Sequence, residues 1–114
     1  MATGTIKTGT AQIAYLTDVT SGVSTYGKVV KDPTTSTVRI FVVARSSSDM
    51  TGQTVLARIP NGFRPKQNEA IYGIIAVGGT NVSTYYGIAY PNGEIKQSLS
   101  SSARACYFSG EYEI

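Results

Sequence analysis

The amino-acid sequence contains few of the residue types that catalysis requires. It has no histidine, which excludes Ser-His-Asp and Cys-His nucleophiles and any zinc site with histidine ligands. Its single cysteine, Cys106, excludes an internal disulfide and a metal cluster built from cysteines. Cys106 alternates in phase with Phe108 along an apolar run, which predicts a buried, unreactive thiol.

Glycoside hydrolysis is the remaining catalytic option, because it needs only two carboxyl groups about 5–9.5 Å apart across a sugar. The seven acidic residues are scattered singly, apart from Glu111 and Glu113, which share a face of the last predicted strand. Two acids with that spacing are usually a solvated strand edge. We therefore do not expect an enzyme. The sequence also has no phosphate-binding glycine loop and no calcium loop, so it implies no cofactor.

Carbohydrate recognition needs an aromatic ring that packs against the apolar face of a sugar ring, and planar polar groups that form hydrogen bonds to the sugar hydroxyls. Such groups occur on one predicted hairpin, in a polar loop and near the last strand. The candidate saccharide-binding residues are Tyr85, Asn81, Tyr86, Tyr90, Arg45, Asp49, Gln53 and Arg104. Tyr86 and Tyr90 share a face with Val82 and Ile88, which favours core packing for their rings. Tyr85 lies on the opposite face and is the leading candidate.

These residues must be positioned by strands. The 114 residues fit one domain, and 41% hydrophobic with only 15% charged residues, 12 glycines and 8 tyrosines favours strands joined by tight turns. The predicted strands are 12–16, 24–31, 37–44, 54–59, 70–77, 82–90, 94–99 and 105–114. Their spacing predicts an antiparallel β-sandwich or jelly-roll-like barrel. Residues 1–10 read as an arm or linker stub, and residues 11–114 as the β head domain.

Alternation of side chains indicates which residues form the core. In the third predicted strand, one face carries Val38, Ile40 and Val42, and the other carries Arg39, Phe41, Val43 and Arg45. In the last strand, Cys106, Phe108, Tyr112 and Ile114 point to the core, with Gly110 as a bulge on the apolar side.

The stretch AIYGIIAV, residues 70–77, has no polar face. Tyr72 and Ile74 lie on one side of it, and Ile71 and Ile75 lie on the other. We expect both faces to be covered, either because the strand is central in the domain or because one face meets another subunit.

Two Pro-Asn-Gly sequences predict tight turns. Proline fixes φ at the first turn position, and glycine accepts the left-handed conformation that follows. The first, at residues 59–65, ends in a second proline and predicts a fixed loop. The second, at residues 90–93, predicts a hairpin turn.

The formal net charge of +3 could suggest a nucleic-acid partner, but lysine and arginine form no run or stripe. We therefore do not expect nucleic acid as the partner. The alternative is a small-barrel single-strand binder, with tyrosines stacking on bases and Arg39, Arg45, Arg58 and Arg64 tracking phosphates. No apolar stretch approaches the about 20 residues that cross a bilayer, so we expect no membrane insertion.

Three segments together resemble the C-terminal heads of phage receptor-binding proteins, in particular those of long-tailed phages of lactic acid bacteria. They are IPNGFRP with the Ile-rich strand after it, the hairpin YYGIAYPNGEI, and the terminal strand ACYFSGEYEI, within residues 37–114. The proline-glycine-aromatic-Arg-Pro turn is the most specific of these features. Family members often use Trp and His in the saccharide pocket, and this chain has neither.

The resemblance implies a compact β head that forms a homotrimer at the fibre tip and binds host cell-wall polysaccharide for adsorption. It also implies a location at the tail tip of the virion, with assembly in the host cytoplasm, and attachment to other phage tail proteins through the N-terminal side. The alternative within the same context is a structural tail or baseplate module without a ligand, in which Tyr72 and Ile74 pack against other subunits.

Overall fold

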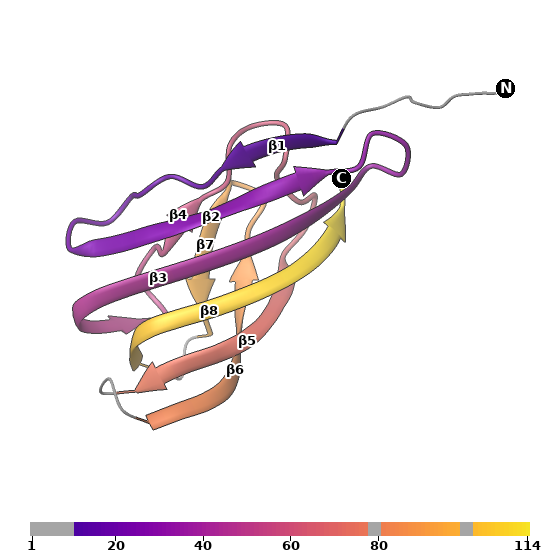
Figure 1. Cartoon of the computed structure of the whole chain (residues 1–114). Coiled ribbons are helices and arrows are strands. Elements are labelled where there is room, and N and C mark those ends of the chain that lie inside the picture. Colours follow the sequence, from indigo (N-terminus) through magenta and orange to yellow (C-terminus); the bar gives the residue numbers. More distant parts are fainter. Residues whose placement is uncertain (1–10, 78–80, 99–101) are drawn as a thin grey trace, which may run out of the picture.

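Eight strands and their connections make up the residues that the computed structural model describes, which are 11–77, 81–98 and 102–114 (Figure 1). The strands are β1 (Gln12–Tyr15), β2 (Val23–Lys31), β3 (Thr37–Thr51), β4 (Ala57–Arg58), β5 (Glu69–Val77), β6 (Asn81–Ala89), β7 (Glu94–Gln97) and β8 (Ser102–Glu113). No helix, and so no membrane-spanning helix, occurs in these three ranges. The all-β prediction is confirmed. The predicted arm, residues 1–10, lies outside the described residues.

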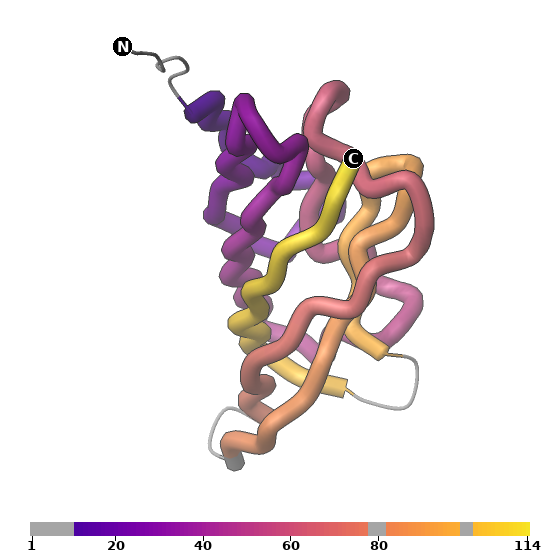
Figure 2. Tube along the Cα trace, turned by 90° about the vertical axis from the view of Figure 1, so that its right-hand side faces the viewer, coloured from indigo at the N-terminus to yellow at the C-terminus, as the bar shows by residue number. Residues whose placement is uncertain are grey.

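The strands form one antiparallel sheet in the order β1-β2-β3-β8-β5-β6-β7-β4. Thr17, just after β1, exchanges two backbone hydrogen bonds with Arg58 of β4, with N···O distances of 3.1 and 3.2 Å. This isolated bridge links the two ends of the strand order at one residue pair. The sheet therefore curls around its own core, with β4 and β7 behind β2 and β3 in Figure 1 and with β1–β3 opposite β6–β7 in Figure 2.

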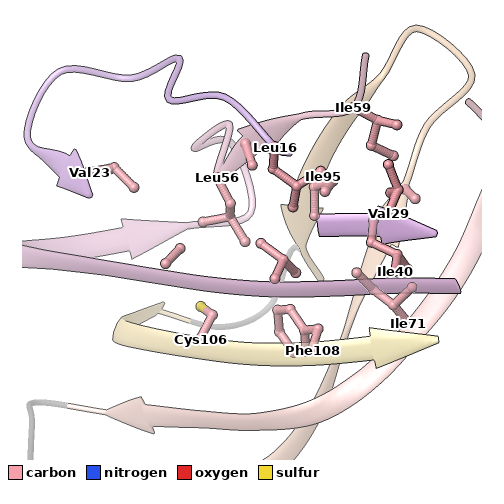
Figure 3. Close-up of a cluster of buried hydrophobic side chains, with 14 of the residues drawn as sticks. Leu16, Val23, Val29, Ile40, Leu56, Ile59, Ile71, Ile95, Cys106 and Phe108 are labelled. Atoms are coloured by element: carbon pink, nitrogen blue, oxygen red, sulfur yellow. The ribbon is translucent and has the colours of Figure 1, made fainter. Parts of the chain in front are cut away.

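The core lies between the inner faces of this curled sheet (Figure 3). Val38, Ile40 and Val42 of β3 and Cys106 and Phe108 of β8 are buried there, as their alternation predicts. The opposite wall contributes Leu56, Ile59 and Ile95. Each such side chain stabilises the fold by about 1.5–3 kcal/mol through the apolar surface it removes from water.

The prediction of a bulge at Gly110 is wrong. Gly110 pairs in register with Ile40, and the ladder between β3 and β8 is continuous on both sides of it. A Cβ atom at Gly110 would lie 2.8 Å from Cγ2 of Ile71. The glycine therefore makes room for a buried side chain of β5.

The pairing of β3 with β8 is irregular elsewhere, toward the C-terminal end of β3. β3 continues to Thr51 instead of ending at residue 44 as predicted, and its register with β8 shifts between Arg45 and Met50. The polar residues in between stay in the strand because Met50 buries its side chain beyond them. Asp49 is therefore a strand residue and does not lie in a loop.

The two Pro-Asn-Gly turns form as predicted. At the second, β6 and β7 form a hairpin in which Ala89 pairs with Ile95. Gly62 and Gly93 have φ values of 91° and 94°, which side-chain-bearing residues rarely adopt. The two glycines differ in surroundings, since a Cβ at Gly62 would meet open space, whereas one at Gly93 would lie 2.7 Å from the carbonyl oxygen of Ile59.

Substitution of these two glycines should separate backbone strain from crowding. We expect Gly62→Ala to cost about 1–2 kcal/mol in the free energy of unfolding, from the left-handed conformation alone. Gly93→Ala should cost at least about 1 kcal/mol more, because the methyl group displaces the backbone of the neighbouring loop. Urea unfolding of both variants measures this, and equal losses would contradict the packing around Gly93.

A short polar chain crosses the core. The Cys106 thiol donates to Oε1 of Gln97 (3.1 Å), and Nε2 of Gln97 donates to the carbonyl oxygen of Met50 (3.1 Å). Burial raises the pKa of the Cys106 thiol to about 12. Burial and, secondarily, the charge of Glu69 also raise the pKa of Tyr112, whose hydroxyl donates to the carbonyl oxygen of Phe63. The predicted buried thiol is confirmed.

These two groups should make the fold sensitive to alkali. The folded protein holds both protons to a higher pH than the unfolded chain, whose Cys and Tyr titrate near about 8.5 and 10. Stability is therefore complete below about pH 8 and falls as the pH rises toward 12, by up to about 1.4 kcal/mol per pH unit for each group that titrates. Urea unfolding from pH 8 to 11 measures the slope, which Cys106→Ala and Tyr112→Phe should each reduce. If both variants kept the slope of the unaltered protein, the alkali sensitivity would not come from Cys106 and Tyr112.

Candidate functional site

Strand register brings aromatic side chains from three neighbouring strands together on the outer face of the sheet. Val43 of β3 pairs with Tyr26 of β2 on one side and with Tyr107 of β8 on the other. Phe41 and Arg45 lie two residues before and after Val43 on the same face. We call this group, Tyr26, Phe41, Arg45 and Tyr107 around Val43, the tyrosine surface.

The rings of the tyrosine surface are open to solvent, although they cover an apolar floor. Tyr26 is 61% exposed and Phe41 43%, and their ring centroids lie 6.4 Å apart with planes tilted by 60°. Val43 is only 1% exposed but is not part of the core cluster. Its burial therefore comes from the outer side chains around it. The result is an aromatic platform on a rigid sheet.

Arg45 is held in place at the edge of this platform. Its Nη2 donates to the hydroxyl of Tyr107 (2.8 Å), and its guanidinium carbon lies 5.7 Å from the centroid of that ring. A cation over an aromatic ring at an exposed site is worth about 0.5–1 kcal/mol. Since a guanidinium group has five N–H donors, Arg45 keeps donors for a ligand.

Two other predicted residues meet at the far end of the same strand pair. Nε of Arg104 on β8 lies 3.2 Å from Oδ1 of Asp49 on β3, and both side chains are exposed. Gln53 follows in the turn after β3, where its backbone N–H donates to Oγ1 of Thr51. The extended β3 thus places Arg45 and Asp49 on one strand.

The hairpin that supplied the leading sequence candidates is turned the other way. Tyr85 packs against the core, whereas Val82 and Tyr86 are on the exposed face. The prediction that Tyr85 and Tyr86 lie on opposite faces is right. The prediction that Tyr86 packs in the core and that Tyr85 faces outward is wrong. Tyr90 lies at the hairpin turn, where the ammonium group of Lys96 is 5.7 Å from its ring centroid.

Asn81 begins β6 opposite Val77, and its side chain lies outside what the structure describes. Tyr85 and Tyr86 have ring centroids 5.4 Å apart. The hairpin candidates lie on or next to β6, which pairs with β5 and β7 and not with β2, β3 or β8. The structure therefore brings together Asp49 with Arg104, and Arg45 with Tyr107, but not the whole predicted set.

Three of the seven acidic side chains, Asp49, Glu94 and Glu111, form ion pairs with cations. Glu111 lies 3.8 Å from Arg39. The described residues contain no group of three or more His, Cys, Asp or Glu side chains that could hold a metal ion. A shallow hollow of about 450 Å³ at the end of the barrel is lined by Lys66, Gln67, Glu69, Glu113 and Ile114. No aromatic ring lines it.

No family model matches the chain, and no curated protein matches its sequence. The functional reading of the tyrosine surface therefore depends on its geometry.

The four arginines that could track phosphates do not share a surface. Arg39 and Arg45 lie on β3, whereas Arg58 lies on β4 and pairs with Glu94 at 3.5 Å. Nε of Arg64 donates to the carbonyl oxygen of Ile59 at 2.7 Å. β3 and β4 are not neighbours in the sheet, so these cations form no continuous path, which disfavours the nucleic-acid alternative.

Sequence reasoning missed Tyr26, Phe41 and Tyr107 as site residues. The signal was present in β3, where Phe41 and Val43 are apolar although Val38, Ile40 and Val42 already fill the inner face. Two apolar residues on the outer face, flanked by arginines, mark this face of β3 as a candidate binding surface. Which rings gather around them depends on the register with β2 and β8.

The exposed rings should contribute little to stability. We expect Tyr26→Ala and Phe41→Ala each to lower the free energy of unfolding by less than about 1 kcal/mol, whereas Phe108→Ala should cost about 3–5 kcal/mol. Thermal or urea unfolding measures the difference. A loss at Tyr26 comparable to that at Phe108 would mean that the platform is structural.

Proposed function

We propose that the protein is a non-catalytic receptor-binding head of a phage tail that recognises saccharides of the host cell envelope through the tyrosine surface. The observation that carries this proposal is the open Tyr26–Phe41 ring pair beside the Arg45–Tyr107 pair. Aromatic rings pack on the apolar face of a pyranose, and the guanidinium and phenol groups bind its hydroxyls.

The mixture of side chains on this surface favours a hydroxyl-rich ligand over an apolar one. Phe41 pairs with Lys28 on one side and with Ser109 on the other, so polar groups flank the ring. A purely apolar ligand would remove these groups from water without giving them a partner, at a cost of about 1–3 kcal/mol for each. A sugar supplies both an apolar face and hydrogen-bonding hydroxyls.

The phage context and the homotrimer come from the resemblance of the sequence to receptor-binding heads. In that setting the N-terminal side attaches to other tail proteins, and the head is exposed at the tip of the virion. Single sugar sites bind weakly, because polar contacts only narrowly outcompete water. Several copies held together raise the overall affinity without any new contact.

Calorimetry with cell-wall polysaccharide fragments from lactic acid bacteria, at millimolar concentration, tests the proposal. We expect binding by the unaltered protein, and an affinity at least about tenfold lower in Tyr26→Ala and in Arg45→Ala. Tyr90→Ala is the matched control, because it removes a tyrosine from the hairpin and should leave affinity unchanged. Loss of binding in Tyr90→Ala alone would place the site on the hairpin and contradict the proposal.

A structural tail module without a ligand is the second candidate, favoured by the apolar outer face of β5. Adsorption assays separate the two. The isolated protein should compete with the phage for host cells and release no reducing sugar ends from the polysaccharide. Absence of both binding and competition would favour the structural module, and release of new sugar ends would establish catalysis.

A further inference from the structure

The outer face of β5 and β6 is apolar and uncovered. Tyr72 is 64% exposed, Ile74 39%, Val82 63% and Tyr86 39%. We call these four side chains the β5–β6 face. They form one patch, because Tyr72 pairs with Tyr86, at a ring-centroid distance of 6.3 Å, and the pairs on either side continue in register.

This patch lies on the middle of the sheet and not at an edge. β5 lies between β8 and β6 in the strand order, and its other face buries Ile71 in the core. The sequence predicts that both faces of this strand are covered. Within one chain, only the inner face of β5 is covered.

The β5–β6 face differs from the tyrosine surface in charge. Its outward residues between Tyr72 and Tyr86 are Ile74, Ala76, Val82 and Thr84, none of which is charged, whereas Arg45 and Lys28 lie among the rings of the tyrosine surface. Depletion of charge marks the centre of protein interfaces. Among these residues only the hydroxyls of Tyr72, Thr84 and Tyr86 could bind a sugar hydroxyl, and no charged group is present. The composition therefore fits a protein better than a polysaccharide.

The exposed area also fits a second copy. Scaling these exposures by the about 150–250 Å² of a large side chain gives on the order of 400 Å² of surface. A standard interface buries about 800 Å² on each partner, somewhat more than half of it apolar. The four side chains would therefore supply the apolar centre of such an interface, and neighbouring residues would supply the rest of its area.

We propose that the β5–β6 face binds the β5–β6 face of other copies of this chain. The inference rests on the homo-oligomer of the proposed function and names the surface that forms it. The tyrosine surface adjoins this face, because its Tyr107 on β8 pairs with Ile74 of β5. Tyr26 and Phe41 lie beyond β8, on β2 and β3, so each copy in the assembly keeps these two rings open to ligand.

Light scattering coupled to size-exclusion chromatography of the full chain tests this proposal. We expect a mass of two or three chains for the unaltered protein, and at least a hundredfold weaker association in Ile74→Lys and in Val82→Lys, because each buries a charge at the centre of the interface. Tyr26→Ala is the matched control on the tyrosine surface and should keep the oligomer mass. A monomeric unaltered protein, or an unchanged mass in Ile74→Lys and Val82→Lys, would overturn the proposal.

Circular dichroism checks that the variants fold. If the lysine variants do not fold, the milder variant Val82→Ser is used in their place, and it should also weaken the association. Saccharide binding measured on the same proteins separates the two proposals. The Val82→Lys monomer should keep its affinity per site, because Val82 lies on β6, which does not neighbour β8. Tyr26→Ala should lose affinity while remaining oligomeric. An unaltered protein that is monomeric and binds saccharide would refute the interface alone, whereas an unaltered protein that is oligomeric and binds no saccharide would refute the saccharide site alone.

Discussion

Insertion of the last strand between two strands that come much earlier in the chain holds the molecule together. β8 pairs with β3 on one side and with β5 on the other, so it joins the N-terminal strands to the β5–β7 meander. Its inner side chains, including Cys106 and Phe108, are central in the core. Without β8 the two parts would each expose an unpaired edge. Such long-range pairing carries a large loop-closure cost, which the buried apolar surface must offset.

The same insertion creates both outer surfaces. β8 brings Tyr107 beside Val43, which completes the tyrosine surface, and it also places Ile74 in the middle of the sheet by pairing with β5. The two surfaces meet at β8, where Tyr107 pairs with Ile74. The proposed ligand site around Tyr26 and Phe41 and the proposed interface around Tyr72, Val82 and Tyr86 lie on different strands of the same sheet.

Much of the fold could be predicted from the sequence, because side-chain alternation and turn chemistry are local. The inner faces of β3 and β8 and both Pro-Asn-Gly turns needed only nearby residues. The sequence of β6 did not show which of its faces points to the core, because both faces carry apolar side chains. A Cβ atom at Gly87 would lie 3.0 Å from the Phe108 ring, so the face with small residues must point inward. That information lies in β8, and alternation within β6 cannot supply it.

The candidate site was harder to predict than the fold for the same reason. Arg45 and Tyr107 are 62 residues apart, and Asp49 and Arg104 are 55 apart, so only the register of β3 against β8 shows that they meet. The length of β3 also depends on its partner, which is why Asp49 looked like a loop residue in the sequence.

Backbone amide NMR shifts, recorded while the ¹⁵N-labelled protein is titrated with cell-wall polysaccharide fragments, test most directly whether ligand and self-association use separate surfaces. We expect the saturable shifts to cluster on β2, β3 and β8 around Tyr26, Phe41, Arg45 and Tyr107, and to leave Tyr72, Val82 and Tyr86 unchanged. Shifts centred on Tyr72 and Val82, or on the hollow beside Glu113, would contradict this division of the sheet.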